Sequence, residues 1–268
     1  MSTHVKEIVQ FLEELFPLSL QESYDNCGLI CGRMDQEVQG VLLCLDSLEA
    51  TVDEAIAKGC NLIVSHHPII FKGVKQLTIK HFIGRTLIKA IRHNISLYAF
   101  HTNLDNVIDG VNKSLADQLQ LTNRRILAPI AGKFDQHGQE IGAGIVGELP
   151  LETEASSFLQ WVKEKFHLSV LKHTPIVNNQ LKTIALCGGS GSFLIDTVKQ
   201  QNIDCFITSD LKYHEFFEAD NRFLLVDIGH GESEQYVPDL IIAYLNIKFP
   251  TFAVLRSLVN TQPVTYLK

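Results

Sequence analysis

The chain alternates short apolar runs with helix-like segments in an order that occurs twice, and this alternation constrains the fold more than any other feature. In the first half the apolar runs are VLLCL (41–45), NLIVS (61–65) and ISLYAF (95–100), which are too short for helices and typical of buried parallel strands. A segment that ends at Lys58 and a second one over about residues 80–93 have the apolar spacing of helices. This order predicts a β-α-β-α-β arrangement.

The second half of the chain repeats this order. Its apolar runs are KTIAL (182–186), DCFIT (204–208) and RFLLVD (222–227), and helices are expected between them. We therefore predict an α/β protein that forms one domain over residues 1–268. It consists of two interlinked β-α-β-α-β lobes with largely parallel sheets, lobe one over about 1–128 and lobe two over about 129–268.

The remaining segments add elements around these lobes. Apolar residues at helical spacing over residues 5–15 predict an N-terminal helix, and Asp46 or Ser47 is placed to cap the helix after the first strand. The segment SYDNCGLICG is rich in turn-forming residues and is expected to be a loop. The other predicted elements are strands at IGAGIVGEL, LSVLK and TFAVL and helices over about residues 152–166 and 234–246.

Composition limits the class of protein. Hydrophobic residues make up 46% of the 268 residues and charged residues 20%, which excludes a disordered chain. The net charge of −7 disfavours general binding to nucleic acids, and no apolar run approaches the ~18 residues that a membrane span needs. Because the first residues already carry charges at Lys6 and Glu7, no signal peptide is recognised, and we expect a cytoplasmic protein whose six cysteines are reduced.

Histidine and carboxylate side chains follow several predicted strands at the point where each strand ends. They are His66, His67, His101, Asp105, Asp210, His230, Glu232 and Glu234. Ligands of parallel α/β sheets bind beyond the carboxyl ends of the strands, so this distribution predicts a functional site.

The residue types and their spacing favour a site for two metal ions. Adjacent His66 and His67 point to opposite sides of an extended backbone, so their imidazoles suit two cations about 3.5–4 Å apart. His230 and Glu234 are four residues apart, which places them on one face of a helical turn. We predict a metal site between the lobes with the ligands His66, His67, Asp105, His230 and Glu234. With one bridging glutamate, each cation has three protein donors and keeps open positions for water, as catalytic sites do.

Less specific interpretations apply to other residues. A histidine at the end of a strand most often only forms hydrogen bonds, and this is our interpretation of the histidines outside the site. Glu232 is expected to be solvated, because Glu234 has the better spacing. The run GGSGS (188–192) follows a strand and opens a helix, so its backbone N–H groups could hold a phosphate, or the run forms only a tight turn. It matches neither a Walker A loop nor a full G-x-G-x-x-G motif.

Six motifs together carry a resemblance to a known family. They are SYDNCGL, IVSHHPIIF, HTNLDNVIDGVN, LCGGSGS, CFITSDLKYHEF and IGHGESE. In this order the chain resembles the Nif-three-like dinuclear-metal family, whose members are also known as GTP cyclohydrolase I type 2 homologues. The resemblance covers nearly the whole chain and is to the short form of the family, without the inserted middle domain.

The resemblance implies a site and an assembly. It implies a two-lobed α/β subunit with two divalent cations at the five ligands named above, Glu234 being the bridging carboxylate, and a toroidal homohexamer with itself as partner. Relatives usually carry a glycine between Thr208 and Asp210, where this chain has Ser209. We therefore treat Asp210 as a pocket residue.

The leading hypothesis is a metal-dependent hydrolase that resembles GTP cyclohydrolase I type 2. Two divalent cations would lower the pKa of a water toward ~7, and the resulting hydroxide would attack a nucleotide-like substrate. Glu234, His101 and Asp210 are the predicted catalytic residues, the last two as orienting or proton-carrying groups. The predicted contacts to the substrate phosphates are Gly188, Gly189, Ser190, Gly191 and Lys212. The ligand types suit zinc, iron, manganese, cobalt or nickel.

Two alternatives to an enzyme stay open. A hexameric ring with internal sites could be a non-enzymatic metal-binding or regulatory protein that stores or delivers metal. A third hypothesis is a structural α/β protein whose metals fix the lobes together. An enzyme needs substrate contacts beside the metals, whereas a store does not.

Overall fold

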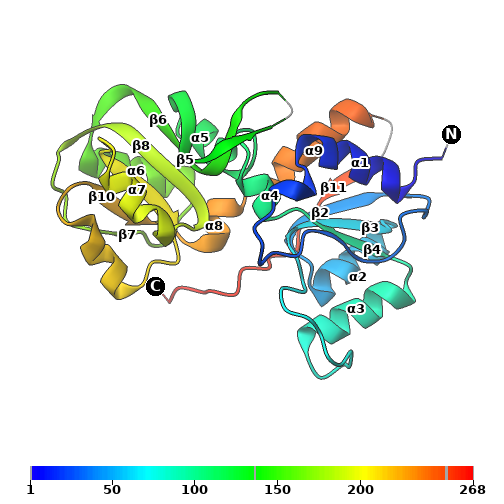
Figure 1. Ribbon diagram of the computed structural model, residues 1–268. Helices are drawn as coiled ribbons and strands as arrows, with labels where there is room; N and C mark the ends of the chain where they lie inside the picture. Colours follow the sequence, from blue (N-terminus) through cyan, green and yellow to red (C-terminus); the bar gives the residue numbers. More distant parts are fainter. Residues whose placement is uncertain (1, 136, 251–252, 268) are drawn as a thin grey trace. The chain divides into compact units, whose positions relative to one another are not determined.

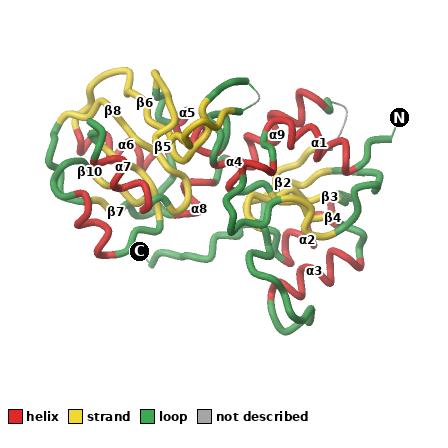
Figure 2. Tube along the Cα trace, in the orientation of Figure 1, coloured by secondary structure: helices red, strands yellow, loops and turns green. Residues whose placement is uncertain are grey.

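Two β-sheets organise the chain, and a computed structural model describes residues 2–135, 137–250 and 253–267 (Figures 1 and 2). The chain divides into two compact units. Unit 1 takes in the chain up to Leu104 together with Val237–Pro263, and unit 2 takes in Asp105–Tyr236 together with Val264–Lys268. This division differs from the predicted lobe boundary near residue 128, because strand β5 (Thr122–Phe134) crosses that position and belongs wholly to unit 2.

The sheet of unit 1 has five strands in the order β1-β4-β3-β2-β11. Its strands are β1 (Gly28–Cys31), β2 (Val41–Asp46), β3 (Leu62–His67), β4 (Ser96–Ala99) and β11 (Val254–Arg256). The three predicted strands β2, β3 and β4 are parallel neighbours, as expected, and β11 extends them in parallel. Strand β1 pairs antiparallel with β4 and lies in the segment that was expected to be a loop. Of the predicted last strand, Thr251 and Phe252 lie outside the described residues.

Helices cover both faces of this sheet, with α1 and α9 on one side and α2 and α3 on the other (Figure 1). The helices of unit 1 are α1 (Val5–Leu15), α2 (Glu49–Lys58), α3 (Phe82–Arg92) and α9 (Val237–Lys248), with the short 3-10 helix η1 (Leu18–Leu20). Gly59 follows helix α2 as its C-cap residue, and its φ of 68° suits a residue without a Cβ atom. Its N-cap residue is Leu48, so the predicted cap by Asp46 or Ser47 is wrong, because β2 continues through Asp46.

The sheet of unit 2 has six strands in the order β5-β6-β8-β9-β10-β7. Besides β5 they are β6 (Glu140–Glu154), β7 (Lys172–His173), β8 (Gln180–Ser190), β9 (Cys205–Ser209) and β10 (Leu224–Asp227). The predicted strands β8, β9 and β10 are parallel, while β5, β6 and β7 pair antiparallel with their neighbours. The strand predicted at LSVLK is wrong except for Lys172, since Leu168 and Leu171 pack as single side chains against the core instead of joining a ladder.

The helices that the sequence predicts in unit 2 are shorter in the structure, and the helix over Val111–Gln118 was not predicted. The described helical segments are α5 (Val111–Gln118), α6 (Ala155–Lys165), η2 (Ser192–Leu194), α7 (Ile195–Lys199), η3 (Tyr213–Ala219) and α8 (His230–Glu234). Helix α4 (Thr102–Asp105) lies where the chain passes from unit 1 to unit 2. Apolar clusters cover both faces of the second sheet. Among the described residues, no helix is long and apolar enough to cross a membrane, and all six cysteines are free thiols.

Candidate metal centre

Three histidines gather at the carboxyl end of the parallel strands in unit 1. His66 and His67 end strand β3, and His101 follows β4 and precedes α4. One ring nitrogen of each histidine lies within 4.8 Å of the others. The ring centroids lie 4.8 Å apart for His66 and His67, and 5.2 and 5.4 Å from His101 respectively. The sheet thus brings together three potential nitrogen ligands from two adjacent strand ends.

The rings of His66 and His67 do not diverge as the sequence suggested. Both residues belong to β3, and His67 still pairs with Asp46 of β2. The β3–β4 ladder ends at the pair Ser65 and Ala99, so both histidines lie past the last residue that pairs with β4. Their rings are tilted by 47° and lie close enough to contribute to one group with His101.

Each of these imidazoles is held at Nδ1 by an oxygen atom. His66 Nδ1 lies 2.9 Å from the Phe100 carbonyl, and His67 Nδ1 lies 2.9 Å from Asp46 Oδ1. His101 Nδ1 lies 2.9 Å from both carboxylate oxygens of Asp25. Because these oxygens only accept hydrogen bonds, the proton is assigned to Nδ1, and Nε2 carries the lone pair. This is the arrangement in which histidines bind metals.

Asp25 is the strongest of these orienting groups. Its side chain is fully buried, and it also accepts hydrogen bonds from the backbone N–H of Thr102 at 3.0 Å and from the Thr102 hydroxyl. Burial alone would raise the pKa of Asp25, but the hydrogen bonds from His101 and Thr102 outweigh it and hold the pKa well below its usual range. Asp25 is therefore a carboxylate at neutral pH.

A second group of potential ligands lies in unit 2, on helix α8. His230 Nε2 lies 3.2 Å from Glu234 Oε2, as expected for residues four apart on one helical face. His230 Nδ1 lies 2.7 Å from Asp210 Oδ2, so Asp210 orients this ring as Asp46 and Asp25 orient theirs. Asp210 has a φ of 57°, a left-handed conformation that turns the chain directly after β9. The Glu234 side chain is only 3% exposed.

Gly189 and Cys187 lie around the Glu234 carboxylate. Gly189 has a φ of 63°, and a Cβ atom there would lie 2.4 Å from Glu234 Oε1, so a larger residue would displace the carboxylate. Burial raises the pKa of the Cys187 thiol, and the charges of Asp105 and Glu234 raise it further. Asp105 is joined to the neighbouring glycine run through Asn112, whose Nδ2 donates to the Asp105 carbonyl at 3.2 Å and whose Oδ1 accepts from the Gly188 N–H at 2.9 Å.

The predicted phosphate-binding run is largely engaged in internal hydrogen bonds. The Gly188 N–H donates to Asn112 Oδ1 at 2.9 Å, and the Gly189 N–H donates to Ser233 Oγ at 2.8 Å. Ser209 is buried, and its hydroxyl donates to the Gly189 carbonyl at 2.5 Å, so this side chain supports the glycine run. Gly191 lies close to Thr208, and Lys212 is exposed at the start of η3.

The residues of both groups fit a divalent cation. Unit 1 offers three imidazoles with Nδ1 held by an oxygen, and unit 2 offers one such imidazole and the carboxylates of Asp105 and Glu234, so nitrogen and oxygen donors are both present. Such sets suit zinc, iron, manganese, cobalt and nickel. The prediction that five ligands form one site with two cations stays a prediction.

Sequence reasoning missed Asp25 and Asp46 as orienting residues. Asp46 directly follows the apolar run VLLCL, so the rule that was applied to the histidines could have found it. Asp25 lies in the SYDNCGL motif, but its partner His101 is 76 residues away in the sequence.

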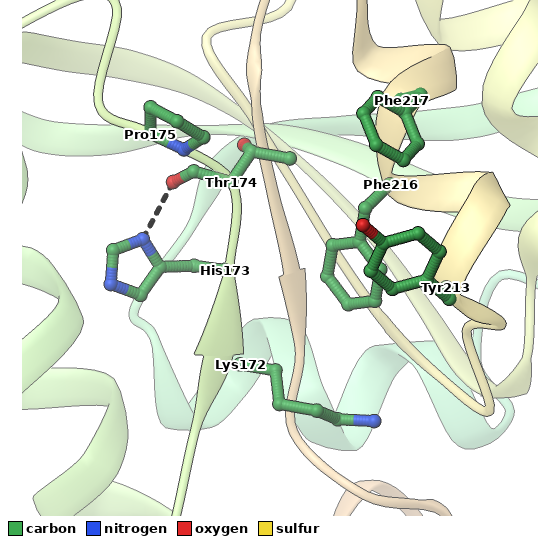
Figure 3. Close-up of a pocket in the computed structure, with 7 residues that line it drawn as sticks. All are labelled: Lys172, His173, Thr174, Pro175, Tyr213, Phe216 and Phe217. Carbon is green, nitrogen blue, oxygen red and sulfur yellow. Dashed lines mark hydrogen bonds between the residues drawn. The ribbon is translucent and has the colours of Figure 1, made fainter.

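A separate pocket of about 350 Å³ lies on unit 2 (Figure 3). Tyr213, Phe216 and Phe217 of η3 line one side, and the segment from Lys172 to Pro175 lines the other. Lys172 Nζ lies 5.9 Å above the Phe216 ring and 2.6 Å from Asp227 Oδ2. Asp227 Oδ1 accepts a hydrogen bond from the Gly229 N–H at 3.0 Å. The pocket and the loop that precedes His230 thus both depend on the end of strand β10.

Comparisons with known proteins agree with this fold. A family model described as Duf34/NIF3 (NGG1p interacting factor 3) matches residues 3–263. A Clostridium acetobutylicum protein named GTP cyclohydrolase 1 type 2 homolog is 34% identical over 235 residues, covering 87% of this chain and 86% of that protein. A Campylobacter jejuni protein of the same name is 35% identical over 233 residues, covering 87% and 88%. The crystal structure of a hypothetical protein of Staphylococcus aureus has a TM-score of 0.90 and 31% identity, covering 100% of both chains.

Proposed function

This chain belongs to the Duf34/NIF3 family, and from that membership and the geometry of the two groups we propose that it is a hydrolase that uses two divalent cations per subunit. One observation carries this proposal. Each of the four histidines has Nδ1 held by a carboxylate or carbonyl oxygen; for the three in unit 1 this assigns the lone pair to Nε2, and His230 Nε2 lies 3.2 Å from Glu234 Oε2 on the same helical face. Histidines that serve only in packing do not require such a repeated arrangement.

The proposed ligands are the five that the sequence predicts, with His101 added. His66, His67 and His101 are the ligands in unit 1, and Asp105, His230 and Glu234 are the ligands in unit 2. His101 joins the set because its ring nitrogen lies within 4.8 Å of those of His66 and His67. Asp25, Asp46 and Asp210 orient the rings that they contact.

Bound divalent cations supply a water whose pKa falls toward about 7, and they polarise an electrophilic centre. The chain's own residues contribute orientation and charge. Asp210 accepts a hydrogen bond from the Nδ1–H group of His230 and therefore favours one orientation of the imidazole ring. Gly189 leaves room for the buried Glu234 carboxylate, because a Cβ atom at position 189 would lie 2.4 Å from Glu234 Oε1.

The proposed substrate is a nucleotide-like molecule, in keeping with the name shared by the curated relatives. Two N–H groups of the glycine run already have acceptors, so Ser190, Gly191 and Lys212 are the contacts that we propose for its phosphates. We also propose that the chain assembles with itself into a toroidal homohexamer, which light scattering coupled to size exclusion would test.

The test of this function is a hydrolysis assay with metal-loaded protein. Nucleoside triphosphates and phosphoesters are offered to the wild type, to His66→Ala and Glu234→Ala, and to His93→Ala as a control at an exposed histidine on the end of α3. We expect turnover by the wild type and the control, and a loss of at least about a hundredfold when a ligand is removed, since metal chemistry carries the reaction. A metal-loaded wild type that hydrolyses none of these compounds would overturn the hydrolase proposal and favour metal storage or regulation.

A further inference from the structure

The carboxylate that orients His67 has a second partner far along the chain. Asp46 Oδ1 lies 2.9 Å from His67 Nδ1, and Asp46 Oδ2 accepts a hydrogen bond from Thr261 Oγ1 at 2.6 Å. The two contacts use different oxygens of the same carboxylate. The three side chains thus form a continuous line from Thr261 through Asp46 to His67, all within unit 1.

Asp46 needs a second contact to hold a fixed orientation. It is the last residue of β2, and its side chain is 32% exposed, so water competes for its oxygens. A carboxylate held at one oxygen only can rotate about its side-chain torsions. A hydrogen bond to the other oxygen restricts this rotation and keeps Oδ1 directed at His67.

Two sets of contacts position the backbone that leads to Thr261. Strand β11 pairs in parallel with β2, with Arg256 opposite Leu43, and the Ser257 N–H continues this pairing by donating to the Leu43 carbonyl at 2.8 Å. Glu54 of helix α2 then holds the segment, since it accepts hydrogen bonds from the Ser257 hydroxyl and, at 2.9 Å, from the Leu258 N–H. The segment that follows β11 is therefore fixed against unit 1 just before it reaches Asp46.

We propose that Thr261 is a positioning residue for the metal ligand His67 and acts through Asp46. The inference rests on the proposed function, because it takes His67 as a ligand. The segment after β11 contains none of the proposed metal ligands. By this inference it nevertheless influences metal affinity. Residues that orient a ligand from outside typically change metal affinity by about 10–100-fold.

The test measures Co²⁺ binding by variants of Thr261. Thr261→Val keeps the branched shape and removes the hydroxyl, Thr261→Ser keeps the hydroxyl, and Thr265→Val is a control at an exposed threonine four residues later in the sequence. Affinity is measured by competition with a chromophoric chelator, and ligand geometry by the visible absorption of bound Co²⁺. We expect Thr261→Val to bind Co²⁺ about tenfold more weakly with a changed spectrum, while the serine variant and the control keep the wild-type values.

A double-mutant cycle shows whether the effect passes through Asp46. Asp46→Ala should weaken Co²⁺ binding by itself, and adding Thr261→Val to it should cause no further loss, because no side chain then links Thr261 to His67. Thermal unfolding of the metal-free proteins verifies that the variants fold, and Thr261→Ala replaces the valine variant if that one does not. Wild-type affinity and spectrum in Thr261→Val, or an unchanged effect of Thr261→Val in the Asp46→Ala background, would overturn the inference.

The failure of the proposed function gives a different result. His67→Ala is measured beside the other variants. If His67→Ala binds Co²⁺ as the wild type does, His67 is not a ligand and the proposed function loses part of its site. If His67→Ala loses Co²⁺ while Thr261→Val does not, only the inference about Thr261 is wrong.

Discussion

The orienting oxygens of the candidate ligands come from residues that are distant in sequence. Asp25 contacts His101 across 76 positions, and Asp46 contacts His67 across 21. The candidate ligands stand out in the sequence, because histidines and carboxylates at strand ends form a local pattern. Asp46 ends an apolar run and lies within reach of the same pattern, whereas Asp25 does not, because the loop that holds it meets His101 only after the chain has folded. The same reason hid the contact between Gly189 and Glu234.

Asp25 should control metal affinity through His101. The variant Asp25→Asn replaces one acceptor oxygen by an amide that donates, so the Nδ1 proton of His101 loses its charged acceptor. We expect metal affinity to fall by about 10–100-fold, measured by chelator competition. Asp35→Asn removes a carboxylate in an exposed ion pair with Arg33 and should leave affinity unchanged. Equal affinities in wild type and Asp25→Asn would show that His101 is not a ligand.

Gly189→Ala should disturb the fold and the metal site together. A side chain at a φ of 63° is strained, and its Cβ atom would lie 2.4 Å from Glu234 Oε1. We expect a loss of about 1–3 kcal/mol in the free energy of unfolding, measured in urea, together with reduced metal content. Gly73→Ala, where a Cβ atom meets nothing within 4 Å, is the matched control. If Gly189→Ala keeps wild-type metal content, the packing of Glu234 against Gly189 does not matter for binding.

Secondary-structure elements were predictable where their sequence pattern was self-contained. Strands β2, β3, β4, β9 and β10 are short, largely buried apolar runs, and the sequence predicts each of them to within two residues at either end. Strand β8 was predicted over 182–186 but extends over Gln180–Ser190, into the glycine run. Strand β5 contains Pro129 and mostly exposed residues, and its pairing with β6 is irregular, so its pattern does not indicate a strand. The 3-10 helix η3 has the apolar content of an α-helix, which periodicity alone does not distinguish.

The start of helix α6 should make stability depend on pH. Glu154 is the N-cap residue; its side chain accepts hydrogen bonds from the Ser156 and Ser157 hydroxyls and, at 2.8 Å, from the Ser157 N–H, and these bonds lower its pKa to about 2. A carboxylate with a lowered pKa in the folded state stabilises the fold above its ordinary pKa of 4.5, and this stabilisation is lost as pH falls toward 2.

The measurement is the melting temperature of Glu154→Gln against wild type between pH 7 and pH 3. Glutamine keeps an acceptor oxygen but not the charge, so we expect the variant to melt at a lower temperature at pH 7 and the difference to shrink as the pH falls below about 4.5. Glu152→Gln, at an exposed residue two positions earlier, serves as control. A difference that stays constant over this range would contradict the role of the Glu154 charge.

The whole molecule combines a family fold with two groups of potential metal ligands. Unit 1 supplies three imidazoles, and unit 2 supplies one imidazole and two carboxylates. The α/β class and the family were both predictable from the sequence, because the strand pattern and the six motifs extend over nearly the whole chain. The division into units was not, because the chain returns to unit 1 at Val237 and adds β11 to the first sheet.

We propose that these two groups hold two divalent cations per chain, and elemental analysis measures this directly. The protein is purified without chelator, reconstituted with Zn²⁺, Mn²⁺, Fe²⁺, Co²⁺ or Ni²⁺ in turn, and desalted before the metal content is measured. We expect close to two cations per chain for at least one metal, with lower metal content in His66→Ala and in Glu234→Ala and unchanged metal content in His93→Ala. A wild type that holds no metal after reconstitution, or ligand variants that keep two cations per chain, would contradict it.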